Sequence, residues 1–265
     1  MPSTSRQHPA RIAPAQIRAR SSVDFQLDIP GLGIIACRRI LRGVSGKRLL
    51  CLGEHGEVQY ILKLFFDPRR ARKHWQQSTA GSRLFAEQGI DTPELIFAGY
   101  LPESGLYCLV LSYLDNALSI KELLSTPEPE TGRQERILKS LFTCIAEQQA
   151  RGIWQQDLNL GNFLVHGEKI FAIDGDHVLK LSGPLSKRRS LDSLASMFVK
   201  LDRFVDIPCE PLFAQYARTR DWVPSQRDQK RLLARIRHRK AFQALKQFVR
   251  RLRRSTQRLL GGKRD

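Results

Sequence analysis

The chain has 265 residues, of which 42% are hydrophobic and 26% charged, a balance typical of a globular protein with one large domain or two modest lobes. No apolar run approaches the roughly 18 residues that a transmembrane helix needs, and the N-terminus lacks the apolar segment of a secretory signal, so we expect neither. Five cysteines without metal-ligand spacing are interpreted as reduced, mostly buried thiols.

The net charge of +18 is concentrated at the two ends of the chain. Residues 1–22 hold four arginines and no acid, and residues 226–265 hold 15 Lys and Arg against two acids, a net charge of +13. The intervening residues 23–225 have a net charge of only +1. Because a folded nucleic-acid-binding core would carry its basic patch within the body, we expect no nucleic-acid partner.

The first half of the chain predicts a basic tail followed by a sheet-rich lobe. Residues 1–22 lack hydrophobic periodicity and are predicted to be disordered. Between residues 23 and 66, strand-like runs are separated by Pro30-Gly31, by the glycine-containing segment 42–48 and by a hairpin turn at Gly53–Gly56, which predicts antiparallel strands. Asp67-Pro68 predicts the start of a helix that ends near Gly89, with Asp67 as its N-cap. Two more strands follow, and together these elements predict an N-lobe over residues 23–115.

The second half changes to helical periodicity. An apolar stripe of Ile137, Leu138, Leu141, Ile145 and Ala146 predicts a helix over 132–151. Two short strands at 163–165 and 169–173 are followed by helices near 188–205 and 210–218, which predicts a mainly helical C-lobe over residues 116–225. Residues 226–261 read as one long basic amphipathic helix, within a final segment 226–265.

The stretch WQQDLNLGNFLV, residues 154–165, is the most informative part of the sequence. Its Asp157 and Asn162 lie five apart, a weak signal that an ordinary Asx turn also explains. The signal strengthens because an apolar strand twelve residues later ends in Asp174, within the sequence DGD. Upstream, Lys63 interrupts the apolar run YILKLFF, where a lysine is costly without an anionic partner unless it extends to solvent from an edge strand.

These residue types in this order point to phosphoryl transfer. That reaction needs charge neutralisation and positioning more than covalent help. A lysine on a sheet can hold phosphates, and the oxygens of Asn162 and Asp174 are ligands that Mg²⁺ prefers. Asp157 can accept the proton of an attacking hydroxyl.

The same residues resemble the protein-kinase-like superfamily over about residues 23–220. The resemblance implies a bilobal α+β fold in which Lys63 binds the phosphates of ATP, Asp157 is the catalytic base, and Asn162 and Asp174 hold Mg²⁺. It also implies that Asp192 supports the catalytic loop. Within the superfamily, the segments GIDTPELIFAG, QQDLNLGNFLV and FAIDGDHV are most similar to the lipopolysaccharide core kinases, the Kdo and heptose kinases of Gram-negative bacteria.

Three features depart from the kinase pattern. The glycine-rich loop is reduced to RGVSGKR at 42–48, and Gln155 occupies a position where protein kinases have histidine. The first helix has no acid in its middle, and Glu87 near its end is a poor match for the glutamate that pairs with the strand lysine. Two alternatives therefore stay open, a small-molecule phosphotransferase of the aminoglycoside-kinase type and a non-catalytic pseudokinase.

The basic C-terminal helix has three interpretations: a solvated last helix of the C-lobe, a membrane-surface helix, or a nucleic-acid-binding helix. We favour an anionic membrane or glycolipid surface, because the lipopolysaccharide core and lipid A precursors implied by the resemblance are polyanionic and membrane-bound. The expected location is cytoplasmic and peripheral at the inner membrane.

Overall fold

The computed structural model describes residues 22–44, 47–126 and 131–261. The chain divides into two compact units, the first comprising residues up to Ala117 together with Leu164–Leu179, and the second comprising Leu118–Phe163 and the residues from Lys180 onward. Of the predicted tail at 1–22, residues 1–21 lie outside the described residues, and Ser22 is the first residue of a strand. Residues 45–46 of the 42–48 segment also lie outside them.

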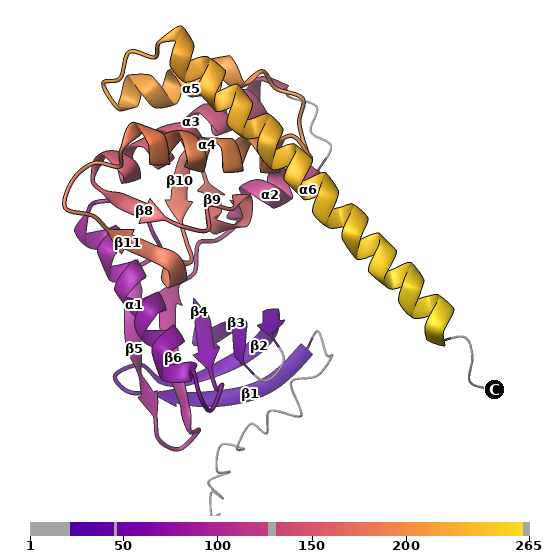
Figure 1. The fold of residues 1–265 in the computed structure, drawn as a ribbon. Helices are drawn as coiled ribbons and strands as arrows, with labels where there is room; N and C mark the ends of the chain where they lie inside the picture. Colours follow the sequence, from indigo (N-terminus) through magenta and orange to yellow (C-terminus); the bar gives the residue numbers. More distant parts are fainter. Residues whose placement is uncertain (1–21, 45–46, 127–130, 262–265) are drawn as a thin grey trace, which may run out of the picture. The chain divides into compact units, whose positions relative to one another are not determined.

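The first unit is built on a six-stranded antiparallel sheet with the strand order β1-β2-β3-β4-β6-β5 (Figure 1). Its strands are β1 (Ser22–Ile29), β2 (Gly33–Val44), β3 (Arg48–His55), β4 (Val58–Phe65), β5 (Leu95–Leu101) and β6 (Leu106–Ser112). The predicted N-terminal antiparallel sheet is thus confirmed. The hairpin turn is tighter than expected, because Gly53 belongs to β3 and only Gly56 adopts the positive φ of the turn.

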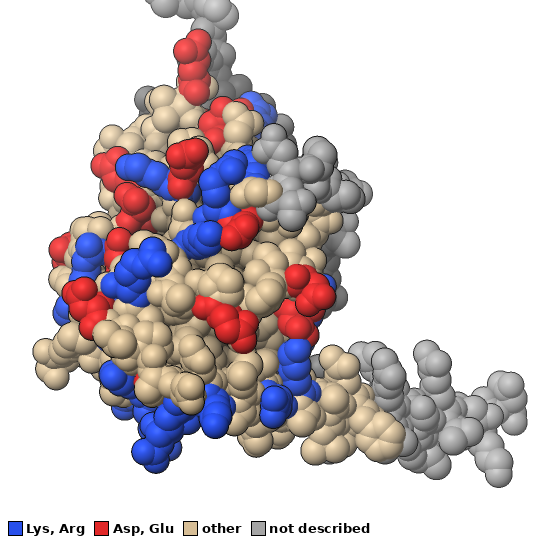
Figure 2. Space-filling view, turned by 90° about the horizontal axis from the view of Figure 1, so that it is seen from above, with Lys and Arg blue, Asp and Glu red and all other residues tan. Residues whose placement is uncertain are grey.

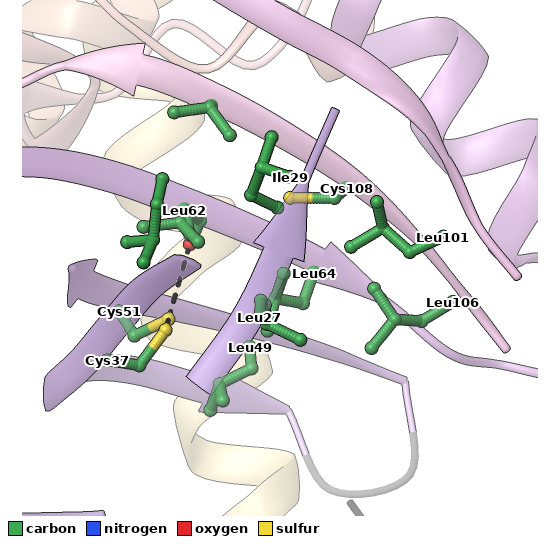
Figure 3. Packing of buried hydrophobic residues seen from close by; sticks show 12 residues of the cluster. Leu27, Ile29, Cys37, Leu49, Cys51, Leu62, Leu64, Leu101, Leu106 and Cys108 are labelled. Atoms are coloured by element: carbon green, nitrogen blue, oxygen red, sulfur yellow. Dashed lines mark hydrogen bonds between the residues drawn. The ribbon is translucent and has the colours of Figure 1, made fainter. Parts of the chain in front are cut away.

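Buried aliphatic and cysteine side chains fill one face of this sheet (Figure 3). Cys37, Cys51 and Cys108 are buried in this cluster, and the Cys51 and Cys37 sulfurs lie 3.6 Å apart as free thiols. The hydrogen bond with Cys37, together with burial, raises the pKa of the Cys51 thiol well above its ordinary value. These cysteines therefore act as small apolar core residues.

Helix α1 (Ala71–Glu87) packs on β6, where the Trp75 indole donates a hydrogen bond of 3.1 Å to the Cys108 carbonyl. The predicted N-cap is wrong, because Asp67 caps the preceding turn and Arg70 is the N-cap of the helix. The Asp67 carboxylate accepts hydrogen bonds from the backbone N–H groups of Arg69 and Arg70. These N–H groups belong to the turn before the helix and not to the helix itself. The first unit is completed by β10 (Lys169–Ala172), by η3 (Gly175–His177), and by most of β9 (Phe163–His166) and β11 (Val178–Lys180).

The second unit is mainly helical, as predicted. Its elements are β7 (Leu118–Ser119), α2 (Ile120–Ser125), α3 (Thr131–Ala150), β8 (Ile153–Gln155), η2 (Leu160–Asn162), α4 (Lys187–Leu201), α5 (Cys209–Thr219) and α6 (Gln226–Gly261). The apolar stripe of α3 is buried over its whole length, and Phe142 packs against Phe198 of α4 with ring centroids 4.9 Å apart. The antiparallel sheet followed by helices confirms the α+β class. Among the described residues, no helix is both long and apolar enough to cross a membrane.

Candidate active site

Lys63 lies in the middle of the sheet, on β4 between β3 and β6. Only 12% of its side chain is exposed, and its ammonium group donates to Ser78 Oγ at 2.8 Å, Asp174 Oδ1 at 2.9 Å and Asp176 Oδ1 at 2.8 Å. An ammonium group has three N–H donors, so this set satisfies it completely. The interpretation of Lys63 as a lysine that extends to solvent from an edge strand is therefore wrong.

Asp174 follows β10 and adopts a left-handed backbone conformation, with φ at 67°. A non-glycine residue in this region is uncommon, although Asp tolerates it better than most, and such conformations cluster at functional sites. The Asp174 side chain is 30% exposed and pairs with Lys63 through one of its oxygens. The sequence prediction that Lys63 and Asp174 share a site is consistent with this 2.9 Å ion pair between residues 111 positions apart.

Asp176 is the residue that sequence reasoning undervalued. The sequence did not select it as a site residue, but it is only 6% exposed and pairs with both Lys63 and Arg48 of β3. Burial by itself raises the pKa of Asp176, but the Lys63 charge, hydrogen bonds from Lys63 and Ser78, and the Arg48 charge outweigh it and lower the pKa to about 2. The available signal was a second acid two positions after Asp174, with only a glycine between them.

Asp157 and Asn162 lie together in the second unit, on the loop between β8 and β9. The Asn162 side-chain amide donates a hydrogen bond of 3.0 Å to the backbone carbonyl of Asp157, which fixes the loop across the five-residue spacing. Asn162 is nearly buried, whereas the Asp157 side chain is 65% exposed. The structure thus presents the Asp157 side chain to solvent on a loop that this hydrogen bond braces.

Lys200 of α4 is a further charged group at this loop, and no sequence pattern had pointed to it. Its ammonium group contacts Asp157 Oδ1 at 3.4 Å and also donates to the backbone carbonyl of Leu158. Burial lowers the pKa of Lys200, and the Arg239 and Arg203 charges add to this effect, while Asp157 opposes it. Asp192, the acid that we expected to support this loop, accepts a hydrogen bond of 2.7 Å from Arg235 of α6.

Glu87 is exposed near the end of α1, which agrees with a solvated helix-end charge. A hollow of about 590 Å³ lies near this end of α1 and beside β5, but neither Lys63 nor Asp174 lines it. We therefore assign the hollow no role in the chemistry of Lys63.

The oxygen donors fit Mg²⁺ by their chemistry. Asp174 offers a partly exposed carboxylate, and Asn162, whose amide N–H is engaged with Asp157, retains its carbonyl oxygen as a donor. Within the part of the chain that the structure describes, no three His, Cys, Asp or Glu side chains gather into a metal-binding cluster.

Comparison with known proteins finds similar solved structures but assigns the chain to no family. No protein-family model matches the chain, and no curated protein matches it. Solved structures of the Mycobacterium tuberculosis PknI kinase domain are similar to it. A single mutant of that domain is 17% identical with a TM-score of 0.46, over 69% of this chain and 76% of that one. A double mutant is 16% identical with a TM-score of 0.47, over 82% of this chain and 99% of that one.

Proposed function

We propose that the protein is an ATP- and Mg²⁺-dependent phosphotransferase that acts on a hydroxyl group. The observation that carries this proposal is the ion pair between Lys63 and Asp174, which joins a buried sheet lysine to a partly exposed carboxylate on a strained backbone. Both residue types, at these places in the chain, are those that phosphoryl transfer requires.

Each unit carries part of the proposed chemistry. In the first unit, Lys63 would bind phosphate oxygens and Asp174 would hold the metal; in the second, Asn162 would supply a further metal ligand. Bound Mg²⁺ would neutralise charge on the transferred phosphoryl group. Asp157 would orient the acceptor hydroxyl and accept its proton, for which its exposure and its contact with Lys200 suit it.

For the acceptor, we propose a sugar hydroxyl of the lipopolysaccharide inner core, with the protein peripheral at the cytoplasmic face of a Gram-negative inner membrane. This is supported by the sequence resemblance to core kinases and by the basic C-terminal helix, which suits a polyanionic glycolipid and an anionic bilayer. A phosphotransferase for another small hydroxyl compound would share the same site. A comparison of core-oligosaccharide masses from cells with and without the gene separates the two, because only a core kinase changes the phosphate content of the core.

The proposed reaction is tested by measuring phosphate transfer from ATP to purified lipopolysaccharide acceptor. Asp157→Ala should lower kcat by about 10²- to 10⁴-fold, because a general base acts in the chemical step, and should leave the KM for ATP nearly unchanged. Asp174→Asn should abolish Mg²⁺-dependent nucleotide binding. Asp202→Asn, which breaks an exposed ion pair with Lys240 on the surface of the second unit, is the matched control and should retain activity.

An Asp157→Ala enzyme that turns over at the rate of the control would remove Asp157 from the reaction. Nucleotide binding without transfer to any acceptor by the unmodified chain would favour the pseudokinase alternative.

A further inference from the structure

Helix α1 carries no acid on the face that meets Lys63. Residues 74–82 contain none, and the helix residue in contact with the ammonium group is Ser78, which is 1% exposed. A hydroxyl alone does not compensate the charge of a buried lysine. Some other carboxylate must therefore hold Lys63 in the sheet.

We propose that Asp176, together with Ser78, is the positioning group for Lys63 and takes the place of a helix carboxylate. This inference rests on the proposed function of Lys63 as a phosphate-binding residue. Asp176 is suited to the role because both of its oxygens are engaged: Oδ1 accepts from Lys63 at 2.8 Å and Oδ2 from Arg48 at 2.5 Å. It is also far less exposed than Asp174, so it is placed to stay in the protein interior while Asp174 meets the metal.

The backbone explains how a loop acid reaches the sheet lysine. Gly81 of α1 and Gly175 of η3 pack against each other directly, so that a Cβ added to Gly81 would lie 2.2 Å from the Gly175 carbonyl oxygen. Real Cβ atoms do not approach backbone so closely, and only glycine at both positions permits this contact. Because of this close packing, Asp176 lies near Ser78 and Lys63. The same contact holds α1 against the segment that carries Asp174.

The contacts of Lys63 assign different roles to Asp174 and Asp176. All three ammonium donors of Lys63 are occupied, and one of them is on Asp174. If Asp174 held a metal ion and Lys63 bound a phosphate oxygen, Asp176 and Ser78 would keep the ammonium group in place. Loss of Asp176 should therefore weaken nucleotide binding even though the residue touches no nucleotide.

The test is calorimetric titration of the full chain with Mg-ATP, with folding checked by circular dichroism. Asp176→Asn keeps the shape of the side chain but removes its charge, and should weaken affinity by about 10- to 100-fold, the usual cost of losing an orienting partner. Adding Ser78→Asp to this variant returns a carboxylate to Lys63 from the helix and should recover part of the lost affinity. A residue that only stabilised the fold would not be rescued by moving the charge.

Two glycine variants test the backbone contact. Gly81→Ala forces α1 and η3 apart and should also weaken Mg-ATP binding, whereas Gly183→Ala, where an added Cβ meets no atom within 4 Å, should not. Asp176→Asn that binds Mg-ATP as tightly as the unmodified chain would overturn the inference. If Asp176→Asn does not fold, unchanged affinity in both Ser78→Ala and Gly81→Ala overturns it. Failure of the unmodified chain to bind Mg-ATP would instead reject the proposed function itself.

Discussion

Two lysines of this protein, Lys63 and Lys200, differ in the groups that surround them. Lys63 is enclosed by a hydroxyl and two carboxylates in the first unit, and Lys200 lies against one carboxylate and one carbonyl in the second. In the first arrangement, the three N–H donors of the nearly buried ammonium group are paired within the protein. The second leaves the Asp157 side chain mostly exposed, so a substrate can compete for it.

The contact between Lys200 and Asp157 gives a test that concerns the chemical step. Lys200→Met removes the cation beside the proposed base while keeping a side chain of similar length. We expect kcat for phosphate transfer to fall by about 10-fold or more, because the base loses its orienting partner, with the KM for ATP unchanged. Steady-state kinetics with ATP and acceptor varied separately measure both quantities.

The matched control is Lys200→Arg, which keeps the charge and should retain more activity than the methionine variant. Equal rates for Lys200→Met and the unmodified enzyme would show that Lys200 serves only the packing of α4.

Helix α6 divides into two parts that face different surroundings. In its first part, Leu232 and Ile236 are buried against the second unit, and Lys240 pairs with Asp202 at 2.6 Å. Between Phe242 and Val249 its apolar side chains are exposed, and in Figure 2 a tan stretch lies along the lower edge of the molecule, beside blue basic residues. The apolar residues concerned are Phe242, Leu245, Phe248 and Val249.

This division decides which basic residues suit a membrane test. Arg235 is ion-paired with Asp192 and Arg239 is half-buried, so neither is freely exposed. The side chain of Arg250 lies outside the described residues. Exposed basic residues on the described part of the helix include Arg231, Arg237 and Lys246.

We therefore expect that changing Arg231, Arg237 and Lys246 together to glutamine weakens binding to vesicles that contain anionic lipid. Each basic residue near such a surface contributes about 1 kcal/mol, so three should lower the partition coefficient by about 100-fold at low salt. Phe242→Ser with Phe248→Ser should weaken binding as well, through loss of apolar burial in the interface. Co-sedimentation at low salt and at 1 M salt, where screening removes most of the attraction, measures both effects.

Vesicles of neutral lipid are the control for the charge variants. Co-sedimentation with anionic vesicles that is the same for the triple glutamine variant and the unmodified chain would reject the membrane role and leave α6 as a structural helix with a solvated outer face.

At the scale of the whole molecule, binding of Mg-ATP should raise the stability of the folded chain. A ligand that binds only the folded state stabilises it by mass action, about 2.7 kcal/mol at 100 times its Kd. For a chain of this size, that corresponds to a rise in Tm of several degrees. We expect Mg-ATP to raise the Tm of the unmodified chain and ethylenediaminetetraacetate to reverse the rise, as measured by differential scanning fluorimetry.

Asp174→Asn supplies the specificity control for this measurement. If Mg-ATP shifts its Tm as much as that of the unmodified chain, the stabilisation comes from a site other than the one proposed.

The sequence predicted most secondary structure well, because hydrophobic periodicity is a local property of strands and helices. The stripe of α3 and the hairpin of β9 and β10 lie within a residue or two of the expected bounds. The start of α1 was misplaced because Asp and Pro are as well suited to a turn as to a helix N-terminus. The sequence also placed Lys63 and Asp174 in one site, because a lysine in an apolar strand is costly without an anionic partner and both residues match the kinase pattern.

The other partners could not be read from spacing. Arg48 and Asp176 are 128 positions apart, and Lys200 and Asp157 are 43 apart, and no local pattern connects the members of either pair. Which charges meet is fixed by the packing of strands and helices, because a buried ion is tolerated only where the fold supplies its counterion. The same holds for α6: its apolar stripe is continuous in sequence, but only the tertiary packing on the second unit decides that Leu232 and Ile236 are buried while Phe242 and Phe248 face solvent.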